Sequence, residues 1–253
     1  MINNKKIAVI VEARMTSTRL PGKVLMPVLG EPCLYRMIER LRKSKHSDDI
    51  IVATTVNKTD DCIVELCEKI GCRYYRGSED DVLRRVLEAA KLHKADLIVE
   101  IPGDNICIDW RHVDYTIKDF FSDQHDFASN CIERSFPMGF DVKIFPTSVL
   151  EEVERTTKNP KDREHVSLYI YMHPEKYRLK NWKAGGKMFW PELQITLDTQ
   201  EDYELISKIY ENLYSKNTDF SAEDVVDLLR ENPELMKINK HIIRKNPFIN
   251  YVK

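Results

Sequence analysis

Residues 6–23 read KIAVIVEARMTSTRLPGK, an apolar run that leads into a loop rich in cations and hydroxyl groups. The run has little polar alternation, which is typical of a strand buried on both faces of a parallel sheet. The loop places Arg14, Arg19 and Lys23 within ten residues, with three hydroxyl residues between the two arginines. Ligands of open α/β sheets bind beyond the carboxyl ends of the strands. The stretch therefore predicts a central strand followed by a triphosphate site, and a solvated basic loop is the alternative.

Two common phosphate loops do not fit this stretch. The pattern GxGxxG is absent. The pattern GxxxxGK[ST] fails because Ser17 stands at the first glycine position and Val24 follows Gly22-Lys23. A Walker-type fold is therefore disfavoured.

Strands and helices alternate through the first 130 residues. Apolar runs predict strands at residues 6–13, 50–55, 72–75 and 97–101, and helical periodicity predicts helices at 34–43, 60–70 and 80–93. This alternation predicts an α/β fold, Rossmann-like, with a mostly parallel sheet and helices on both faces.

The pattern changes in the second half of the chain. We expect strands at residues 126–131, 140–145, 177–182 and 192–197, helices at 147–156, 161–172, 200–214 and 222–232, and a basic tail at 241–253. No Gly/Ser linker divides the chain. We therefore expect a single domain over residues 1–253, with a mixed β extension at about 126–197.

The composition excludes several classes of function. The 253 residues carry 39 Lys and Arg against 41 Asp and Glu, a formal net charge of -2, so a broadly basic nucleic-acid-binding surface is not expected. No apolar run approaches the ~20 residues that span a bilayer, and the N-terminal run is too short for a signal peptide. We expect a cytoplasmic protein with neither membrane nor nucleic acid as a partner. The six cysteines form no CxxC pair, which favours reduced thiols over a zinc site.

Two further strand ends carry an aspartate. Asp104 follows Pro102-Gly103, and Asp198 ends the run ITLD. Either carboxylate could bind Mg²⁺, which takes few protein carboxylates together with phosphate oxygens and water. Asp104 could instead form an Asx turn, and Asp198 could cap the next helix unless Thr199 caps it with Asp202 in a capping box. A basic loop with two such acids predicts Mg²⁺-assisted transfer at a nucleotide phosphate.

Residues 13–25, ARMTSTRLPGKVL, resemble the signature of the cytidylyltransferases that make CMP-activated sugar acids. The spore-coat polysaccharide branch of that family, with ARMxSTRLPGKVL, is the most similar. Thr16 stands where glycine is usual. Shorter motifs follow in the family's order at residues 53–61, 77–83, 103–105, 137–141, 163–166 and 197–203.

This resemblance implies a nucleotide-diphospho-sugar transferase fold, CTP as donor, Mg²⁺ as cofactor and pyrophosphate as leaving group. It assigns Arg14, Arg19 and Lys23 to the triphosphate as catalytic cations, and Asp104 and Asp198 to Mg²⁺. The remaining CTP-binding positions that it implies are Ala13, Thr54, Arg76, Gly77, Ser78 and Asp81. Pro102 departs from the Gln or Thr that is common before Gly-Asp in the family.

The resemblance also implies an acceptor site at Gly139 and Asp141 and at Arg163, Glu164 and His165, although the last three could form an ordinary surface turn. Members of the branch act on phosphorylated acceptors, so we expect an acceptor such as L-glutamine phosphate, giving CDP-glutamine for phosphoramidate modification of capsule polysaccharide. A phosphate is already anionic at pH 7 and needs no general base.

Three alternatives to this function remain open at the level of sequence. The acceptor could be the hydroxyl of a 2-keto-3-deoxy sugar acid. The chain could be a nucleotide-sugar glycosyltransferase, although no DxD motif follows a strand, or a non-catalytic nucleotide-binding module. Relatives often form homodimers through the β extension, and residues 189–191 (Phe-Trp-Pro) could belong to such an interface or to the core.

Overall fold

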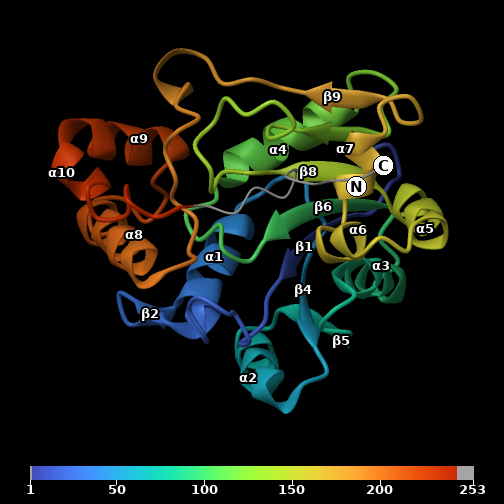
Figure 1. The fold of residues 1–253 in the computed structure, drawn as a ribbon, viewed down its shortest axis with the longest axis horizontal. Coiled ribbons are helices and arrows are strands. Elements are labelled where there is room, and N and C mark those ends of the chain that lie inside the picture. The colour runs from blue at the N-terminus through green and yellow to red at the C-terminus, as the bar shows by residue number, and fades with distance from the viewer. Residues whose placement is uncertain (1, 244–253) are drawn as a thin grey trace.

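A seven-stranded sheet forms the centre of the computed structural model, which describes residues 2–243 (Figure 1). The strand order is β5-β4-β1-β6-β8-β7-β9. The strands are β1 (Ile7–Glu12), β4 (Asp49–Thr55), β5 (Arg73–Gly77), β6 (Leu97–Pro102), β7 (Phe127–Ser129), β8 (Lys143–Pro146) and β9 (Leu179–Asn181). A separate hairpin pairs β2 (Pro27–Val28) with β3 (Glu31–Pro32). Most of the basic tail lies outside the described residues.

Strands β5, β4, β1 and β6 are parallel, so their carboxyl ends meet at one edge of the sheet. Strand β1 is fully buried from Ile7 to Val11. Its alternate residues face two different apolar clusters, with Val9 in one and Ile10 in the other. The prediction of an α/β fold with a mostly parallel sheet is confirmed.

Helices cover both faces of this sheet. One face packs on α1 (Cys33–Leu41), α2 (Asp61–Lys69) and α4 (Trp110–Phe120). The other face packs on α3 (Val82–Leu92), α5 (Thr147–Thr156) and α7 (Leu168–Met172). The short helix α6 (Pro160–Glu164) lies beside α3. Single 3-10 turns occur at Lys23–Leu25, Lys58–Asp60 and Gly186–Met188.

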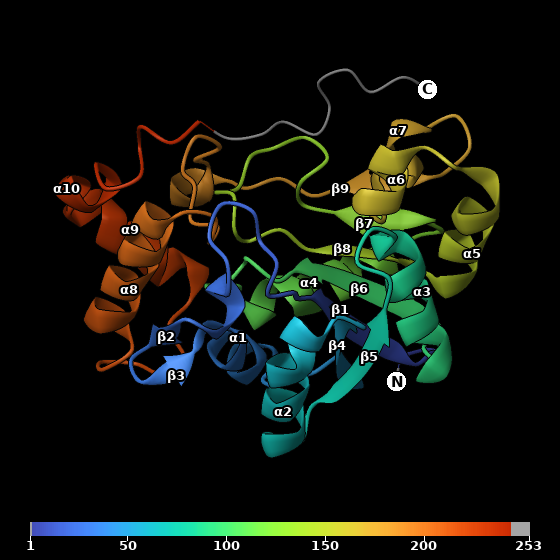
Figure 2. The ribbon, with the colours of Figure 1, turned by 60° about the horizontal axis from the view of Figure 1, so that its bottom comes forward.

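The last helices form a third apolar cluster at one side of the molecule (Figures 1 and 2). They are α8 (Gln200–Leu213), α9 (Ala222–Glu231) and α10 (Pro233–Met236). Helices α3, α5 and α6 lie at the opposite side in both views. None of the helices in residues 2–243 is long and apolar enough to cross a membrane.

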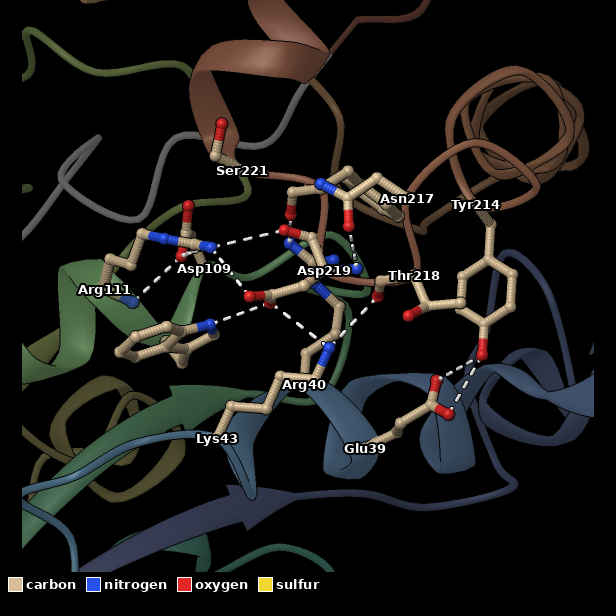
Figure 3. A network of polar contacts seen from close by, with 12 residues as sticks. Glu39, Arg40, Lys43, Asp109, Arg111, Tyr214, Asn217, Thr218, Asp219 and Ser221 are labelled. Carbon is tan, nitrogen blue, oxygen red and sulfur yellow. Dashed lines mark hydrogen bonds and ion pairs between the residues drawn. The ribbon is translucent and has the colours of Figure 1, made fainter.

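Arg40 of α1 joins the loop before α4 to the loop between α8 and α9 (Figure 3). Its Nε donates to the carbonyl of Ile108 at 2.7 Å, and its Nη2 donates to the carbonyl of Phe220 at 2.8 Å. Asp219 beside it pairs with Lys43 of α1 and with Arg111 of α4. These contacts fix the loop between α8 and α9 against the α1 layer.

Four element predictions were wrong in detail. Residues 192–197 form no strand, because this segment makes only a single bridge, between Gln194 and Met138. The helix expected at 161–172 breaks into α6 and α7, because Val166 takes a left-handed conformation with φ 47°. Strand β8 begins at Lys143 rather than at residue 140. Helix α4, with Asp109 as its N-cap, was not expected.

Candidate active site

The loop after β1 is fixed to the carboxyl edge of the sheet by main-chain contacts. The amide of Ala13 donates to the carbonyl of Ala53 at 3.2 Å, and the amide of Met15 donates to Asp60 Oδ1 at 2.9 Å. The loop closes on itself where the amide of Gly22 donates to the carbonyl of Met15 at 2.8 Å. Gly22 has φ 74°, a left-handed conformation that favours glycine. These contacts place the side chains of the loop over the end of the central strand.

Two of the three predicted phosphate-binding cations converge on one carboxylate. Lys23 Nζ lies 2.9 Å from Asp198 Oδ1 and donates to the carbonyl of Leu197 at 2.6 Å. Arg19 Nη2 lies 3.0 Å from the same Asp198 oxygen. Arg14 instead contacts Glu79 Oε1 at 3.4 Å. Lys23 and Arg19 therefore lie together at this strand end, each paired with Asp198, whereas Arg14 pairs with Glu79.

The two predicted metal ligands lie at one place. The amide of Leu197 donates to the carbonyl of Asp104 at 2.9 Å, and Lys23 Nζ lies 3.8 Å from Asp104 Oδ2. Thr199 and Asp202 form the capping box of α8. Thr199 is therefore the N-cap, and the Asp198 carboxylate faces Lys23 and Arg19 instead.

The charge balance at these acids fits a divalent cation. Burial raises the pKa of Asp104 to about 6, with Lys23 opposing this effect and the neighbouring Asp198 and Asp141 adding to it. A bound cation would favour the ionised form of this carboxyl group. Among residues 2–243 no set of three His, Cys, Asp or Glu side chains gathers as a metal site. A pair of aspartates fits Mg²⁺ that completes its shell with phosphate oxygens and water.

Gly103 is required by the close approach of β1 and β6. A Cβ atom at Gly103 would lie 2.1 Å from the carbonyl oxygen of Glu12. The main chain can therefore present Asp104 at this edge only with glycine before it.

Two adjoining cavities meet at these residues. The first, of about 380 Å³, is lined by the loop after β1 together with Arg85, Gly103, Asp104 and Asp198. The second, of about 620 Å³, extends over the β extension. Both are lined by Glu12, Pro102, Asp104, Glu164, His165 and Asp198. The cavities therefore adjoin along a largely acidic wall, where Lys23 and Arg19 of the smaller cavity contact the shared Asp198.

A family model described as "Cytidylyltransferase" matches residues 8–238 of this chain. The chain belongs to the cytidylyltransferase family. It is a CTP-dependent nucleotidyltransferase. The alternative that it is a nucleotide-sugar glycosyltransferase is therefore rejected.

Two relatives of this cytidylyltransferase match nearly its whole length, and a third matches about three quarters of it. The spore coat polysaccharide biosynthesis protein SpsF of Bacillus subtilis is 34% identical over 233 residues, 90% of this chain and 95% of that protein. An uncharacterized protein of Methanocaldococcus jannaschii is 34% identical over 242 residues, 95% of this chain and 97% of that protein. The 3-deoxy-manno-octulosonate cytidylyltransferase of Chloroherpeton thalassium is 27% identical over 186 residues, 73% of this chain and 70% of that protein.

A solved cytidylyltransferase of Leptospira borgpetersenii has the same fold. It is 32% identical with a TM-score of 0.87, and the match covers 96% of this chain and 100% of that one. The fold expected for the family is therefore confirmed.

Several predicted CTP-binding residues of this cytidylyltransferase shape the neighbouring loops and are absent from the lining of the 380 Å³ cavity. Thr54 is buried and donates to Asp60 at 3.0 Å. Arg76 donates to the carbonyls of Thr55 and Asn57, each at 2.8 Å. Gly77 ends β5, and Ser78 Oγ accepts from the amide of Asp81 at 3.1 Å. Asp81 caps α3.

The predicted acceptor residues divide into two groups. Asp141, Glu164 and His165 line the larger cavity of the cytidylyltransferase. Arg163 lines neither cavity and instead pairs with Asp81 and with Glu154, which ties α6 to α3 and α5. Gly139 has φ 116°, and a Cβ there would lie 2.7 Å from Ile195 Cγ1, so this turn requires glycine.

Sequence reasoning missed several charged residues that line the two cavities or, like Glu79, lie beside them. Glu79 binds the side chains of Arg14, Thr16 and Asn57 and so joins the loop after β1 to the loop after β5. The other missed residues are Glu12, Arg85, Glu100, Arg134 and Lys143. A charged residue inside the apolar run LIVEI was visible in the sequence, and Glu100 could have been found from it.

The remaining sequence expectations concern the cysteines and the aromatic run at residues 189–191. All six cysteines are free thiols. Trp190 packs against the third cluster beneath Arg230, whose guanidinium lies 4.3 Å from the ring centre, whereas Phe189 is exposed. The run therefore contributes one residue to the core and leaves one on the surface.

Proposed function

We propose that this cytidylyltransferase transfers CMP from CTP to a phosphorylated acceptor in surface polysaccharide modification, with L-glutamine phosphate as the acceptor and CDP-glutamine as the product. The observation that carries the proposal is the pair of adjoining cavities with Lys23 and Arg19 at Asp198, on their common wall. Two anionic substrates that approach each other need cations at the meeting point. The name of the SpsF relative supports a role in polysaccharide synthesis.

The reaction is an in-line displacement at the α-phosphorus of CTP. An oxygen of the acceptor phosphate forms the new P–O bond, the bond to the bridging oxygen of the β-phosphate breaks, and pyrophosphate leaves. Arg14, Arg19 and Lys23 would bind the triphosphate and stabilise the charge that develops on the leaving oxygens. Asp104 and Asp198 would hold Mg²⁺, which when bound neutralises charge on the phosphate oxygens.

The acceptor side of this proposal needs no strong base. Burial lowers the pKa of His165, so its imidazole is neutral at pH 7. A neutral imidazole can donate a hydrogen bond to an acceptor phosphate at the junction of the cavities. The β extension supplies much of the acceptor wall, including Arg134, Lys143 and His165, and we assign that role to it within a single domain over residues 1–253.

A sugar acid is the second candidate acceptor, because a relative that is 27% identical is named for 3-deoxy-manno-octulosonate. Pyrophosphate release separates the two candidates. With CTP and Mg²⁺ we expect release with L-glutamine phosphate and none with unphosphorylated glutamine. Release with 2-keto-3-deoxy-manno-octonate alone would reject the phosphorylated acceptor.

The metal part of the proposal has its own test. Chelation of divalent cations should abolish turnover, and Mg²⁺ should restore it. Asp104→Asn should raise the Mg²⁺ concentration needed for half-maximal rate, whereas Asp123→Asn, an exposed control, should not. Unchanged activity after the double replacement of Asp104 and Asp198 by Asn would rule out the metal assignment.

A further inference from the structure

Three charged side chains project into the larger cavity from adjacent strands of the central sheet. Glu12 pairs with Pro102 across β1 and β6, and Lys143 pairs with Glu100 across β6 and β8. Paired residues share a face of a sheet, and so do residues two apart on one strand. Glu12, Glu100 and Lys143 therefore lie on one face, and all three line the 620 Å³ cavity.

Two carboxylate oxygens in this group lack a hydrogen-bond donor. Lys143 Nζ donates to Glu100 Oε1 at 2.6 Å, which leaves Glu100 Oε2 buried and without a partner. Glu12 Oε1 is likewise buried and without a partner. Glu100 is only 3% exposed, so bulk water does not readily supply the missing hydrogen-bond donor to this carboxylate. Buried polar atoms are normally hydrogen-bonded, so these oxygens indicate a donor that arrives with a ligand.

The charge of the cavity favours a cationic donor over a neutral hydroxyl group. Its lining holds six carboxyl groups, at Glu12, Glu100, Asp104, Asp141, Glu164 and Asp198. Four cations pair with four of these groups: Lys143 with Glu100, Arg134 with Asp141, and Lys23 and Arg19 with Asp104 and Asp198, so the acids remain in excess by two. Burial, and to a lesser degree the charge of Glu100, hold the pKa of Glu12 well above its usual range, and a bound cation would favour its ionised form.

We propose that the acceptor carries an ammonium group, which binds Glu12 Oε1 and Glu100 Oε2 on the sheet floor of the larger cavity. The acceptor is then a phosphorylated amino compound, with its phosphate toward Lys23 and its ammonium toward the two glutamates. This inference rests on the proposed function and deepens it. An ammonium has three donors and no acceptor, which matches oxygens that lack donors. A cavity of 620 Å³ is large enough for a molecule of amino-acid size.

Matched acceptors test the proposal. Steady-state pyrophosphate release is measured with CTP and Mg²⁺, comparing L-glutamine phosphate with its desamino counterpart, and O-phosphoserine with 3-phosphoglycerate. For at least one pair we expect kcat/KM to be about 10- to 100-fold higher for the ammonium compound. This is the difference expected when the desamino compound cannot form one charged hydrogen bond. Equal turnover within both pairs would overturn the inference and leave the phosphorylated-acceptor proposal standing. No turnover with any phosphorylated compound would overturn both.

Two variants locate the ammonium site. Glu100→Gln and Glu12→Gln should each reduce the preference for the ammonium compound, measured as the ratio of its kcat/KM to that of the desamino compound, mainly through the KM of the ammonium compound. Glu211→Gln, on the exposed side of α8, should leave the preference unchanged. Binding of CTP by calorimetry confirms that each variant is folded, and the variant at Glu12 preserves the test if the loss of the Glu100–Lys143 pair unfolds the protein. An unchanged preference in a folded variant at Glu12 would overturn the assignment.

Discussion

Lys23 is one of the three cations proposed to bind phosphate, and it pairs with both predicted metal ligands. Its Nζ lies 2.9 Å from Asp198 and 3.8 Å from Asp104, and the 3-10 turn Lys23–Leu25 sets its direction. A cation fixed in this way needs no reorganisation when charge develops on the leaving pyrophosphate. Lys23→Ala should therefore lower kcat by ~10²-fold or more.

Single-turnover kinetics with saturating CTP measure this effect on the chemical step. Lys216→Ala, which removes an exposed lysine beyond α8, is the control and should keep full activity. A rate for Lys23→Ala within a few-fold of the unsubstituted enzyme would exclude Lys23 from catalysis.

Gly103 offers a second prediction at the residue scale. A Cβ there would lie 2.1 Å from the main-chain oxygen of Glu12, so Gly103→Ala must separate β1 from β6 at the active-site edge. We expect a loss of roughly 1–3 kcal/mol in the free energy of unfolding, as for other overpacked sites. Denaturant titration measures this loss, and activity should fall with it.

The matched control is Gly185→Ala. Nothing lies within 4 Å of a Cβ at Gly185, and its φ of -124° is open to any residue. Equal stability of the two alanine variants would contradict the close approach of the strands.

At the scale of elements, Asp60 joins the end of β4 to the loop after β1. Its Oδ1 accepts from the amide of Met15, and its Oδ2 accepts from both Thr54 and Thr55. Burial alone would raise the pKa of Asp60, but these hydrogen bonds outweigh burial and lower it. A lowered pKa means that the folded state binds the ionised form better than the unfolded chain does.

Asp60→Asn should therefore cost about 1–3 kcal/mol of unfolding free energy at pH 7. The contribution of the carboxylate is complete above the unfolded pKa near ~4 and is lost as the pH falls through the lower folded pKa. Urea titrations of both proteins from pH 7 to pH 3 measure the difference, which should shrink at the acid end. A difference that does not depend on pH would show that the charge of Asp60 is not responsible, and Asp123→Asn serves as the exposed control.

The elements also show how far the sequence could be read. Strands β1, β4 and β6 were predictable because each is a continuous apolar run. Residues 192–197 have a similar pattern, but Ile195 and Leu197 are buried in the third apolar cluster, and their amides donate singly to the carbonyls of Met138 and Asp104 without forming a strand. Periodicity detects burial and cannot distinguish these two ways of achieving it.

The candidate site was likewise predictable from the sequence only in part. The phosphate loop and the two strand-end aspartates are local patterns, so the sequence located Arg19, Lys23 and Asp198. Glu100 and Lys143 come together only through the pairing of β6 with β8, a contact 43 residues apart that no local pattern contains. Arg163 shows the opposite case, since a motif residue facing the acceptor was expected and its guanidinium binds Asp81 and Glu154.

At the scale of the whole molecule, Arg40 connects α1 and the loop before α4 to the C-terminal helices (Figure 3). It is 2% exposed, it binds two main-chain carbonyls from distant segments, and its guanidinium lies 3.9 Å from the ring centre of Phe220. Arg40→Met should leave those carbonyls buried without donors and cost roughly 1.5–3 kcal/mol.

Hydrogen exchange of the main-chain amides tests whether that loss is local or global. We expect protection to fall in α8 and α9 together with α1, because the network spans all three. Arg155→Met, at an exposed position on α5, should change neither stability nor exchange. Loss of protection confined to α1 would show that the stability of the C-terminal helices does not depend on Arg40.

Strand β8 runs antiparallel to β6 and so continues the sheet whose other half carries the phosphate loop. Lys143, the residue of β8 that lines the larger cavity, can therefore be exchanged while the main chain of β1 stays in place. On the proposed function, such an exchange would alter which acceptor the enzyme uses without inserting or rebuilding a loop.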